Sequence, residues 1–151
     1  MKTYVVYLTT MENSPEVEIL SVTTSKKIAD EKFKVAMERE EEWMADVEED
    51  SGDWAQASMI ELYTPPGITE GKEAFVVVMN EWCDEVTTSI CPFPSKSEAK
   101  WWVDSWKKNL TESDDRIEPY DEDDTIEESM HLRNPYIMID YYFSIVPVIV
   151  E

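Results

Sequence analysis

The sequence predicts an α+β fold in which two tandem β-β-α-β repeats pack into one pseudo-symmetric unit. Three observations indicate this fold: an internal similarity without gaps, β-branched runs that precede amphipathic helices, and a Pro-Pro-Gly boundary near the middle of the chain. A shift of 70 residues aligns about 30 positions, placing Ser25 on Ser95 and Ala29 on Ala99. The identities are few, but the order of structural signals repeats.

In the first half, the β-branched and aromatic run Tyr4–Leu8 predicts a strand. A polar turn at Met11–Glu16 leads to an alternating strand at Val17–Val22. A helix then begins near Ser25, and Ser58–Tyr63 predicts the closing strand. The helix has apolar residues at spacings of three and four, interrupted by Glu40: Ala29, Phe33, Ala36 or Met37, Trp43 or Met44, and Val47.

The second half repeats these signals. Strands are expected at Ala74–Val78 and Val86–Cys91, joined by a polar turn at Asn80–Glu85. Ser95–Glu98 is a capping box that predicts a helix start. Tyr141–Val146 predicts the last strand. The helix has its own apolar stripe: Ala99, Trp102 or Val103, Trp106 and Leu110.

Pro65-Pro66-Gly67 separates the halves, so the predicted domains are residues 1–66 and 72–151. The second half carries about 15 extra residues before its last strand, at 114–128. This insertion is mostly acidic and shows no periodic apolar pattern. We therefore expect it to form a long acidic loop.

Acidic residues dominate the composition, with a formal net charge of −21 on 151 residues. Of the 34 acidic residues, 19 fall in the stretches Glu38–Asp53 and Glu112–Glu128, each of which holds a single arginine. Such a charge argues against direct binding of nucleic acid, because phosphate contacts need lysine and arginine. It also disfavours anionic membranes. A basic partner, a metal ion or plain solubility remain as explanations.

Several motifs that the sequence lacks exclude further classes of protein. No segment reads as a signal peptide or as a membrane helix of about 20 apolar residues, and two cysteines do not make a disulfide framework. We therefore expect a cytoplasmic protein with reduced thiols. The second acidic stretch lacks the glycine of a calcium-binding EF-hand loop. We expect no cofactor and no metal.

Catalysis has little support in the sequence. His131 is the only histidine, and Cys83 and Cys91 form neither a CxxC motif nor a zinc-ligand set with it. Among the six tryptophans, Trp43 and Trp54 flank the first acidic stretch. A tryptophan beside carboxylates suits a protein interface, although core packing is the simpler reading of most of these aromatic residues.

The first acidic stretch suggests a specific function. If the helix continued through Asp50, a stretch of 16 residues would span about 24 Å and carry about one net charge per 3 Å, close to the spacing of phosphates along a DNA strand. The alternative is a solvated helix surface. On the mimic hypothesis, the partner-binding acidic residues are Glu38, Glu41, Glu42, Asp46, Glu49, Asp50, Asp121, Asp123, Asp124 and Glu127.

The sequence therefore favours a non-enzymatic acidic protein that mimics nucleic acid and inhibits a cationic DNA- or RNA-binding protein. In size, charge and missing catalytic motifs it resembles the small acidic proteins with which phages and mobile elements inhibit host defence or host DNA-binding factors. The alternative is an accessory or assembly module, in which acidity serves solubility and an edge strand such as Phe143–Val150 forms a homodimer. A small-molecule or metal-dependent enzyme is a third class.

Overall fold

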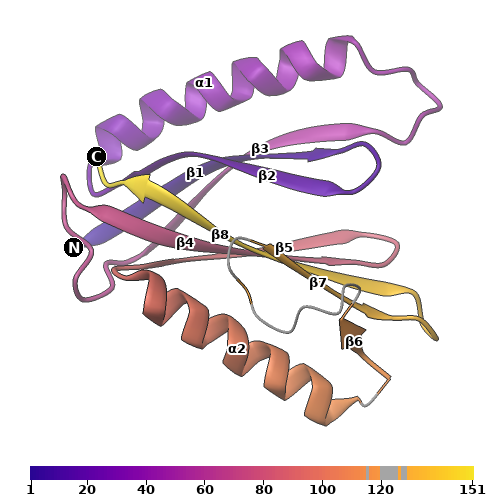
Figure 1. Ribbon diagram of the computed structural model, residues 1–151. Helices are drawn as coiled ribbons and strands as arrows, with labels where there is room; N and C mark the ends of the chain where they lie inside the picture. Colours follow the sequence, from indigo (N-terminus) through magenta and orange to yellow (C-terminus); the bar gives the residue numbers. More distant parts are fainter. Residues whose placement is uncertain (115, 120–125, 127–128) are drawn as a thin grey trace. The chain divides into compact units, whose positions relative to one another are not determined.

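A computed structural model describes residues 1–114, 116–119, 126 and 129–151. The predicted α+β class is confirmed, because the described chain contains two antiparallel sheets and two helices (Figure 1). The chain divides into two compact units. The first consists of Met1–Glu73 together with Val148–Glu151, and the second of Ala74–Pro147.

The first unit is a three-stranded sheet with one helix. Its elements are β1 (Lys2–Met11), β2 (Pro15–Thr23), α1 (Lys26–Ala45) and β3 (Trp54–Tyr63). The strand order is β2-β1-β3, and β1 pairs antiparallel with both neighbours. Helix α1 covers one face of this sheet (Figure 1).

Small residues let α1 approach the sheet closely. Ala29 and Ala36 are fully buried against Tyr4 and Val6 of β1. Larger side chains pack around this centre: Leu20, Phe33, Ala57 and Met59. Because these contacts come from the apolar stripe of the helix, charged positions such as Glu38, Glu41 and Glu42 are left exposed to solvent.

The last residues of the chain complete the first unit. The backbone N–H of Glu151 donates to the carbonyl of Val22 at 2.8 Å, and the N–H of Val150 donates to the carbonyl of Lys72 at 2.9 Å. The Ser21 hydroxyl donates to the Glu151 carboxylate at 2.9 Å. The C-terminus is thereby fixed to the end of β2 and to the turn before the second unit.

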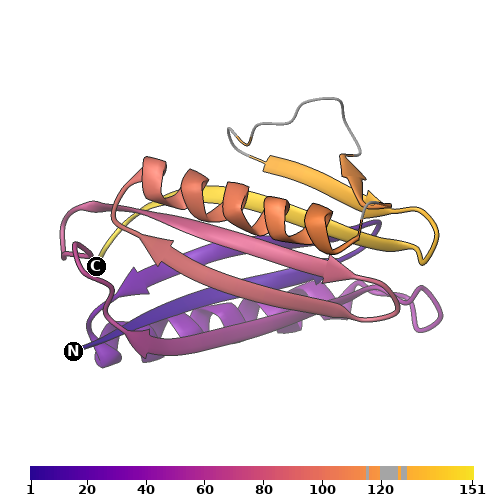
Figure 2. The ribbon, with the colours of Figure 1, turned by 90° about the horizontal axis from the view of Figure 1, so that it is seen from below.

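The second unit has a larger sheet and the second helix. Its elements are β4 (Glu73–Trp82), β5 (Val86–Phe93), α2 (Lys96–Ser113), β6 (Glu118–Pro119), β7 (Ser129–Asn134) and β8 (Ile139–Ile149). The strand order is β5-β4-β8-β7-β6. Helix α2 lies across this sheet (Figure 2), and its buried residues Ala99 and Val103 pack with Val77, Leu132 and Phe143.

The second half differs from the predicted β-β-α-β order, since β6 and β7 come before the closing strand. In β7, Met130 and Leu132 are buried and alternate with polar residues, a pattern too short to be recognised from the sequence. Strand β8 lies between β4 and β7, so the prediction of a free edge at Phe143–Val150 was wrong along the length paired with β7, Ile139–Ser144.

The acidic insertion is partly anchored in the core. Ile117 and Ile126 are 7% and 1% exposed and belong to the same apolar cluster as Phe143. The prediction of a long acidic loop did not include these two core contacts, because Ile117 and Ile126 are too far apart in sequence to form a periodic pattern. Residues 120–125 and 127–128 of the insertion lie outside the described chain.

Both predicted helix starts are confirmed. The Ser95 hydroxyl accepts a hydrogen bond from the backbone N–H of Glu98 at 3.2 Å, and it donates to the Glu98 carboxylate at 2.9 Å. Ser25 caps α1 in the same way, accepting from the N–H of Ile28 at 3.3 Å. Neither helix combines the length and the apolar character needed to cross a bilayer, among the residues the structure describes.

Replacing Phe143 by alanine tests the core of the second unit. Phe143 is 1% exposed, so the substitution leaves a cavity among well-packed neighbours. We expect the free energy of unfolding, measured by urea denaturation, to fall by about 3–5 kcal/mol. Ile137→Ala is the control, because Ile137 is 49% exposed and its loss should cost under about 0.5 kcal/mol. Equal losses for both variants would contradict the placement of Phe143 in the core.

Candidate acidic site on the first unit

The predicted acidic residues of the first stretch lie on the surface of the first unit. Glu38, Glu41 and Glu42 are exposed on the last turns of α1, and Asp46, Glu49 and Asp50 are exposed in the segment that follows. A second predicted group lies outside the described residues: Asp121, Asp123, Asp124 and Glu127.

Helix α1 ends at Ala45 rather than continuing through Asp50, so the straight acidic stripe of 16 residues does not form. Asp46 leaves the helix with φ −95° and ψ 1°, and its N–H reaches back to the carbonyls of the last turn. Electrostatics explains the early end, because the helix C-terminus carries partial negative charge and each further carboxylate there is unfavourable. Gly52, with φ +77°, then completes the turn toward β3.

The charges of α1 run against its macrodipole. Its lysines stand in the first half of the helix, whereas Glu38, Glu40, Glu41 and Glu42 stand in the second half. The first turn contains no acidic residue and the last turn no basic residue. The opposite arrangement would stabilise the helix, typically by 0.3–1 kcal/mol for each charge. The negative potential of the backbone and that of the carboxylates therefore add at the same end of the helix.

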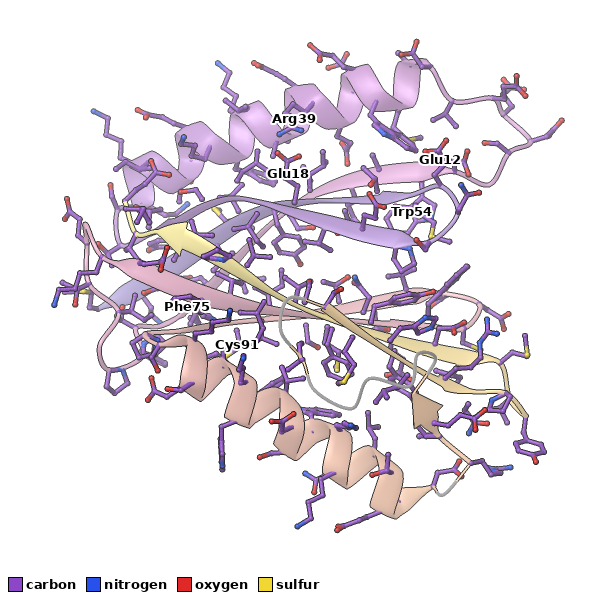
Figure 3. The ribbon with its side chains drawn as sticks, viewed as in Figure 1. Glu12, Glu18, Arg39, Trp54, Phe75 and Cys91 are labelled. Carbon is purple, nitrogen blue, oxygen red and sulfur yellow. The ribbon has the colours of Figure 1, made fainter. Side chains whose placement is uncertain are left out.

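A cavity of about 360 Å³ opens beside this end of the helix. Its lining combines carboxylates with one large aromatic side chain: Glu12, Trp43, Asp46, Val47, Glu48, Ser51 and Asp53. Glu12 comes from the β1–β2 turn and the remaining residues from α1 and the connection to β3. Figure 3 labels Glu12 at the turn between β1 and β2 and Trp54 at the first residue of β3.

Local hydrogen bonds fix the backbone of the connection that forms one wall of the cavity. The Ser51 hydroxyl donates to the Glu48 carbonyl at 2.9 Å and accepts from the N–H of Asp53 at 3.2 Å. The N–H of Val47 donates to the carbonyl of Met44 at 3.2 Å. The carboxylates of Glu48 and Asp53 are therefore held on a defined turn.

A second cavity, of about 280 Å³, shares Trp43 with the first. Arg39 lines it together with Glu16 and Glu18. The Arg39 guanidinium donates to both oxygens of the Glu18 carboxylate, with Nη1 2.9 Å from Oε1, and Figure 3 shows the two side chains pointing toward one another. These hydrogen bonds lower the pKa of Glu18.

Helix α1 also covers part of the free edge of β3. The Glu40 carboxylate accepts a hydrogen bond from the backbone N–H of Ala57 at 3.0 Å, and the Met44 sulfur accepts from the N–H of Ala55 at 3.2 Å. These contacts explain why Glu40 interrupts the apolar stripe. They also occupy two donors that a further strand would need in order to pair with β3.

The second unit holds His131, the only histidine of the sequence, in a cluster around Asp140. His131 Nε2 lies 2.7 Å from Asp140 Oδ1, and the Arg133 Nε–H donates to the same oxygen at 2.8 Å. The His131 ring stacks on Tyr142, with centroids 4.2 Å apart. Burial alone would raise the pKa of Asp140, but the hydrogen bonds from Arg133 and His131 lower it. This cluster joins β7 to β8.

The sequence singled out Trp43 and Asp46 but not the other three carboxylates of the cavity, Glu12, Glu48 and Asp53. Glu12 could not be placed there, because a turn between two strands gives no sign of which helix it approaches. Glu48 and Asp53 belong to the acidic stretch, but their positions depend on where α1 ends. Within the described residues, no group of three histidine, cysteine, aspartate or glutamate side chains is arranged to hold a metal ion.

Removing the Glu40 carboxylate tests the covered edge of β3. In Glu40→Ala the Ala57 N–H loses its acceptor, so the free energy of unfolding should fall by about 1–2 kcal/mol. Glu41→Ala removes an exposed carboxylate from the same helix and should change stability by less than about 0.5 kcal/mol. Urea denaturation of both variants measures the difference, and a Glu40 variant as stable as the Glu41 variant would refute the structural role.

Asp140 gives the fold a defined pH dependence. Because its folded pKa is lowered, its contribution to stability is present above the unfolded pKa and is lost as the pH falls through the folded value. We expect Asp140→Asn to cost about 1–2 kcal/mol at pH 7 and less at pH 3, in urea denaturation at each pH. Asp104→Asn, at an exposed position, is the control. A cost that is the same at both pH values would contradict the ionised role of Asp140.

Comparisons with known proteins identify no relative that indicates what the site does. No known protein family matches the sequence, and neither a curated protein nor a solved structure matches it significantly. The function is therefore argued from the charge, the cavities and the exposed residues of the first unit.

Proposed function

We propose that this protein is a non-enzymatic inhibitor that binds a cationic DNA- or RNA-binding protein in place of nucleic acid. The observation that carries the proposal is the concentration of exposed carboxylates at the C-terminal end of α1 and in the turn after it. This placement opposes the helix dipole and contributes nothing to helix stability. Binding a cationic surface explains why carboxylates stand at this end of the helix.

The charge spacing still supports mimicry although the helix is shorter than expected. Residues 38–45 span about 12 Å along the helix axis and contain four glutamates. The guanidinium of Arg39 is matched by Glu18 on β2 and so takes little from this charge. Because Glu40 is bonded to β3, the three exposed glutamates give about one negative charge per 4 Å, against one per 3.4 Å along a DNA strand. The turn that follows extends the acidic surface beyond the helix.

This mode of binding needs no cofactor and no catalytic group. Complementary charge speeds association and makes the complex sensitive to salt. The partner would lose access to nucleic acid because its cationic groove is occupied. The predicted acidic residues outside the described chain, Asp121, Asp123, Asp124 and Glu127, belong to the same proposal as a second acidic segment.

The assembly alternative has weaker structural support. It relied on a free edge at Phe143–Val150, and the first two residues of that segment are paired with β7. The edge of β3 has two of its backbone donors bonded to α1 side chains. A homodimer stays a prediction of that alternative, which would be expected to resist salt.

We further propose that the two halves descend from one duplicated β-β-α-β segment. The first half has this order, and the second half has it as well when β6 and β7 are taken as an insertion before β8. The helix caps Ser25 and Ser95, 70 residues apart, are the most specific shared feature. Their pairing into one pseudo-symmetric unit remains part of the proposal.

Charge reversal tests the function. The variant Glu38→Lys, Glu41→Lys, Glu42→Lys, Glu49→Lys should lose its partner in affinity capture from a bacterial lysate, with affinity reduced on the order of tenfold or more. Wild-type protein should capture a nucleic-acid-binding protein at low salt, and duplex DNA should release it. The lysines favour the C-terminal end of the helix, so folding should be retained.

The matched control reverses the same number of exposed acids elsewhere: Glu70→Lys, Glu73→Lys, Asp84→Lys, Asp104→Lys. Both variants have the same net charge, so only the position of the charges differs. If the two variants bound the partner equally, or if the α1 variant bound as well as wild type, the proposed site would be wrong.

A further inference from the structure

The outer edge of the second sheet lacks the protection that edge strands usually carry. Strand β5 is the outermost strand beside β4, and the described chain holds no strand on its other side (Figure 2). Exposed edges are normally blunted by charged side chains, by bulges or by a covering segment. Residues 86–95 contain no charged side chain, although charged residues make up 31% of the sequence, and β5 pairs with β4 in an uninterrupted register.

The backbone of β5 presents hydrogen-bonding groups to this edge. At the turn of the hairpin, the N–H of Cys83 donates to the carbonyl of Glu85 at 3.2 Å. Bonded and non-bonded positions alternate along an antiparallel pair, so the residues bonded to β4 are Thr87, Ser89 and Cys91. The residues between them direct their N–H and C=O groups away from β4: Val86, Thr88 and Ile90. Within the described chain, no hydrogen bond ties these N–H groups to another segment.

Pro92 agrees with this alternation. It is the next residue of the outward series and lies opposite Val76 of β4. Proline has no N–H to donate and occurs in sheets where its nitrogen faces away from the neighbouring strand. Strand β5 therefore carries three N–H donors on its free edge, at the spacing that a further antiparallel strand needs.

The other edge strands that the structure describes are charged, occupied or very short. Strand β2 carries Glu16 and Glu18. Along β3, the N–H groups of Ala55 and Ala57 are bonded to side chains of α1. Strand β6 consists of two residues. Among these edges, β5 is the one left open for pairing.

The two ends of β5 have opposite charge. One end is the turn that contains Asp84 and Glu85, both exposed. The other end leads to the start of α2, where Lys96 is exposed and the helix dipole is positive. Glu98 stands at the same end, but its carboxylate is hydrogen-bonded by the hydroxyl of the cap Ser95. An antiparallel second copy of β5 brings each acidic turn toward the other copy's helix start, whereas a parallel copy brings like charges together.

We propose that the free edge of β5 pairs antiparallel with β5 of a second copy of this chain, so that two sheets join across a two-fold axis. The same strand serves on both sides of the contact, as in the commonest symmetric dimers. The new hydrogen bonds come from Val86, Thr88 and Ile90, whose β-branched side chains suit a sheet. This inference does not depend on the function proposed above. It also differs from dimerisation at Phe143–Val150, because it uses another strand.

Amide hydrogen exchange of the wild-type protein, followed by NMR, tests the pairing directly. Three N–H groups should exchange on the order of tenfold more slowly in concentrated than in dilute protein: Val86, Thr88 and Ile90. The internal control is the set bonded to β4, which should be equally protected at both concentrations: Thr87, Ser89 and Cys91.

Sedimentation equilibrium measures the dimer in parallel. The mass should rise with concentration from the 17.6 kDa of one chain toward twice that value. The dimer should be stronger at high salt, because each copy carries a net charge of −21 and salt screens the repulsion between them. This salt dependence is opposite to the one expected for a complex with a cationic partner.

Lysines placed on the edge strand test the position of the contact. The variant Thr87→Lys, Ser89→Lys should raise the dissociation constant of the dimer on the order of tenfold or more, because charged side chains on an edge oppose pairing. The matched control Gln56→Lys, Thr69→Lys changes two exposed residues of the first unit and should dimerise like the wild type. Both variants change the net charge equally, so general repulsion does not account for a difference between them.

Two results would overturn the dimer proposal. One is exchange at Val86, Thr88 and Ile90 that does not depend on protein concentration, as in a protein that stays monomeric. The other is a β5 lysine variant that dimerises as well as the wild type. Exchange is measured on the wild type, so it decides the matter even if the lysine variant does not fold. Capture of a partner that DNA releases tests the proposed function separately and is unaffected by either result.

Discussion

The packing of α1 on β1 determines where the carboxylates of the first unit stand. Ala29 and Ala36 allow the helix to lie close to Tyr4 and Val6, and this contact fixes the rotation of the helix about its axis. With the apolar stripe buried, Glu38, Glu41 and Glu42 are exposed to solvent. The same rotation carries Trp43 to the place where the two cavities meet. A change in this packing would move both the acidic surface and the cavities.

Charge is distributed in α1 in a way that stability alone does not explain. Carboxylates stand at the C-terminal end of the helix, where the helix dipole makes them unfavourable. Contacts with neighbouring strands stabilise some of the charged side chains there. Arg39 is paired with Glu18, and Glu40 accepts a backbone hydrogen bond from β3, so these two side chains support the fold. Their neighbours Glu41 and Glu42 are exposed and have no such role. The division between structural and free carboxylates is what makes a binding role the better explanation of the free ones.

Sequence patterns were sufficient for the elements that depend on local signals. Alternating and β-branched runs predicted the strands of the first half, and Ser25 and Ser95 predicted the helix starts. Long-range contacts were beyond the patterns: β7 is short and mostly polar, and Ile126 enters the core as a single residue. The candidate site depends both on local sequence signals and on long-range contacts. The acidic residues were evident, whereas the cavity depends on the end of α1 and on Glu12, which folding brings near it.

The most direct measurement of the central claim is a competition experiment with the captured partner. The partner is bound to fluorescently labelled duplex DNA, and this protein is added while the anisotropy is recorded at low and at high salt. Mimicry predicts that the DNA is released completely, that more DNA requires proportionally more protein, and that both complexes weaken with salt. A ternary complex, in which the DNA stays bound while this protein also binds, would contradict the claim that the acidic surface takes the place of nucleic acid.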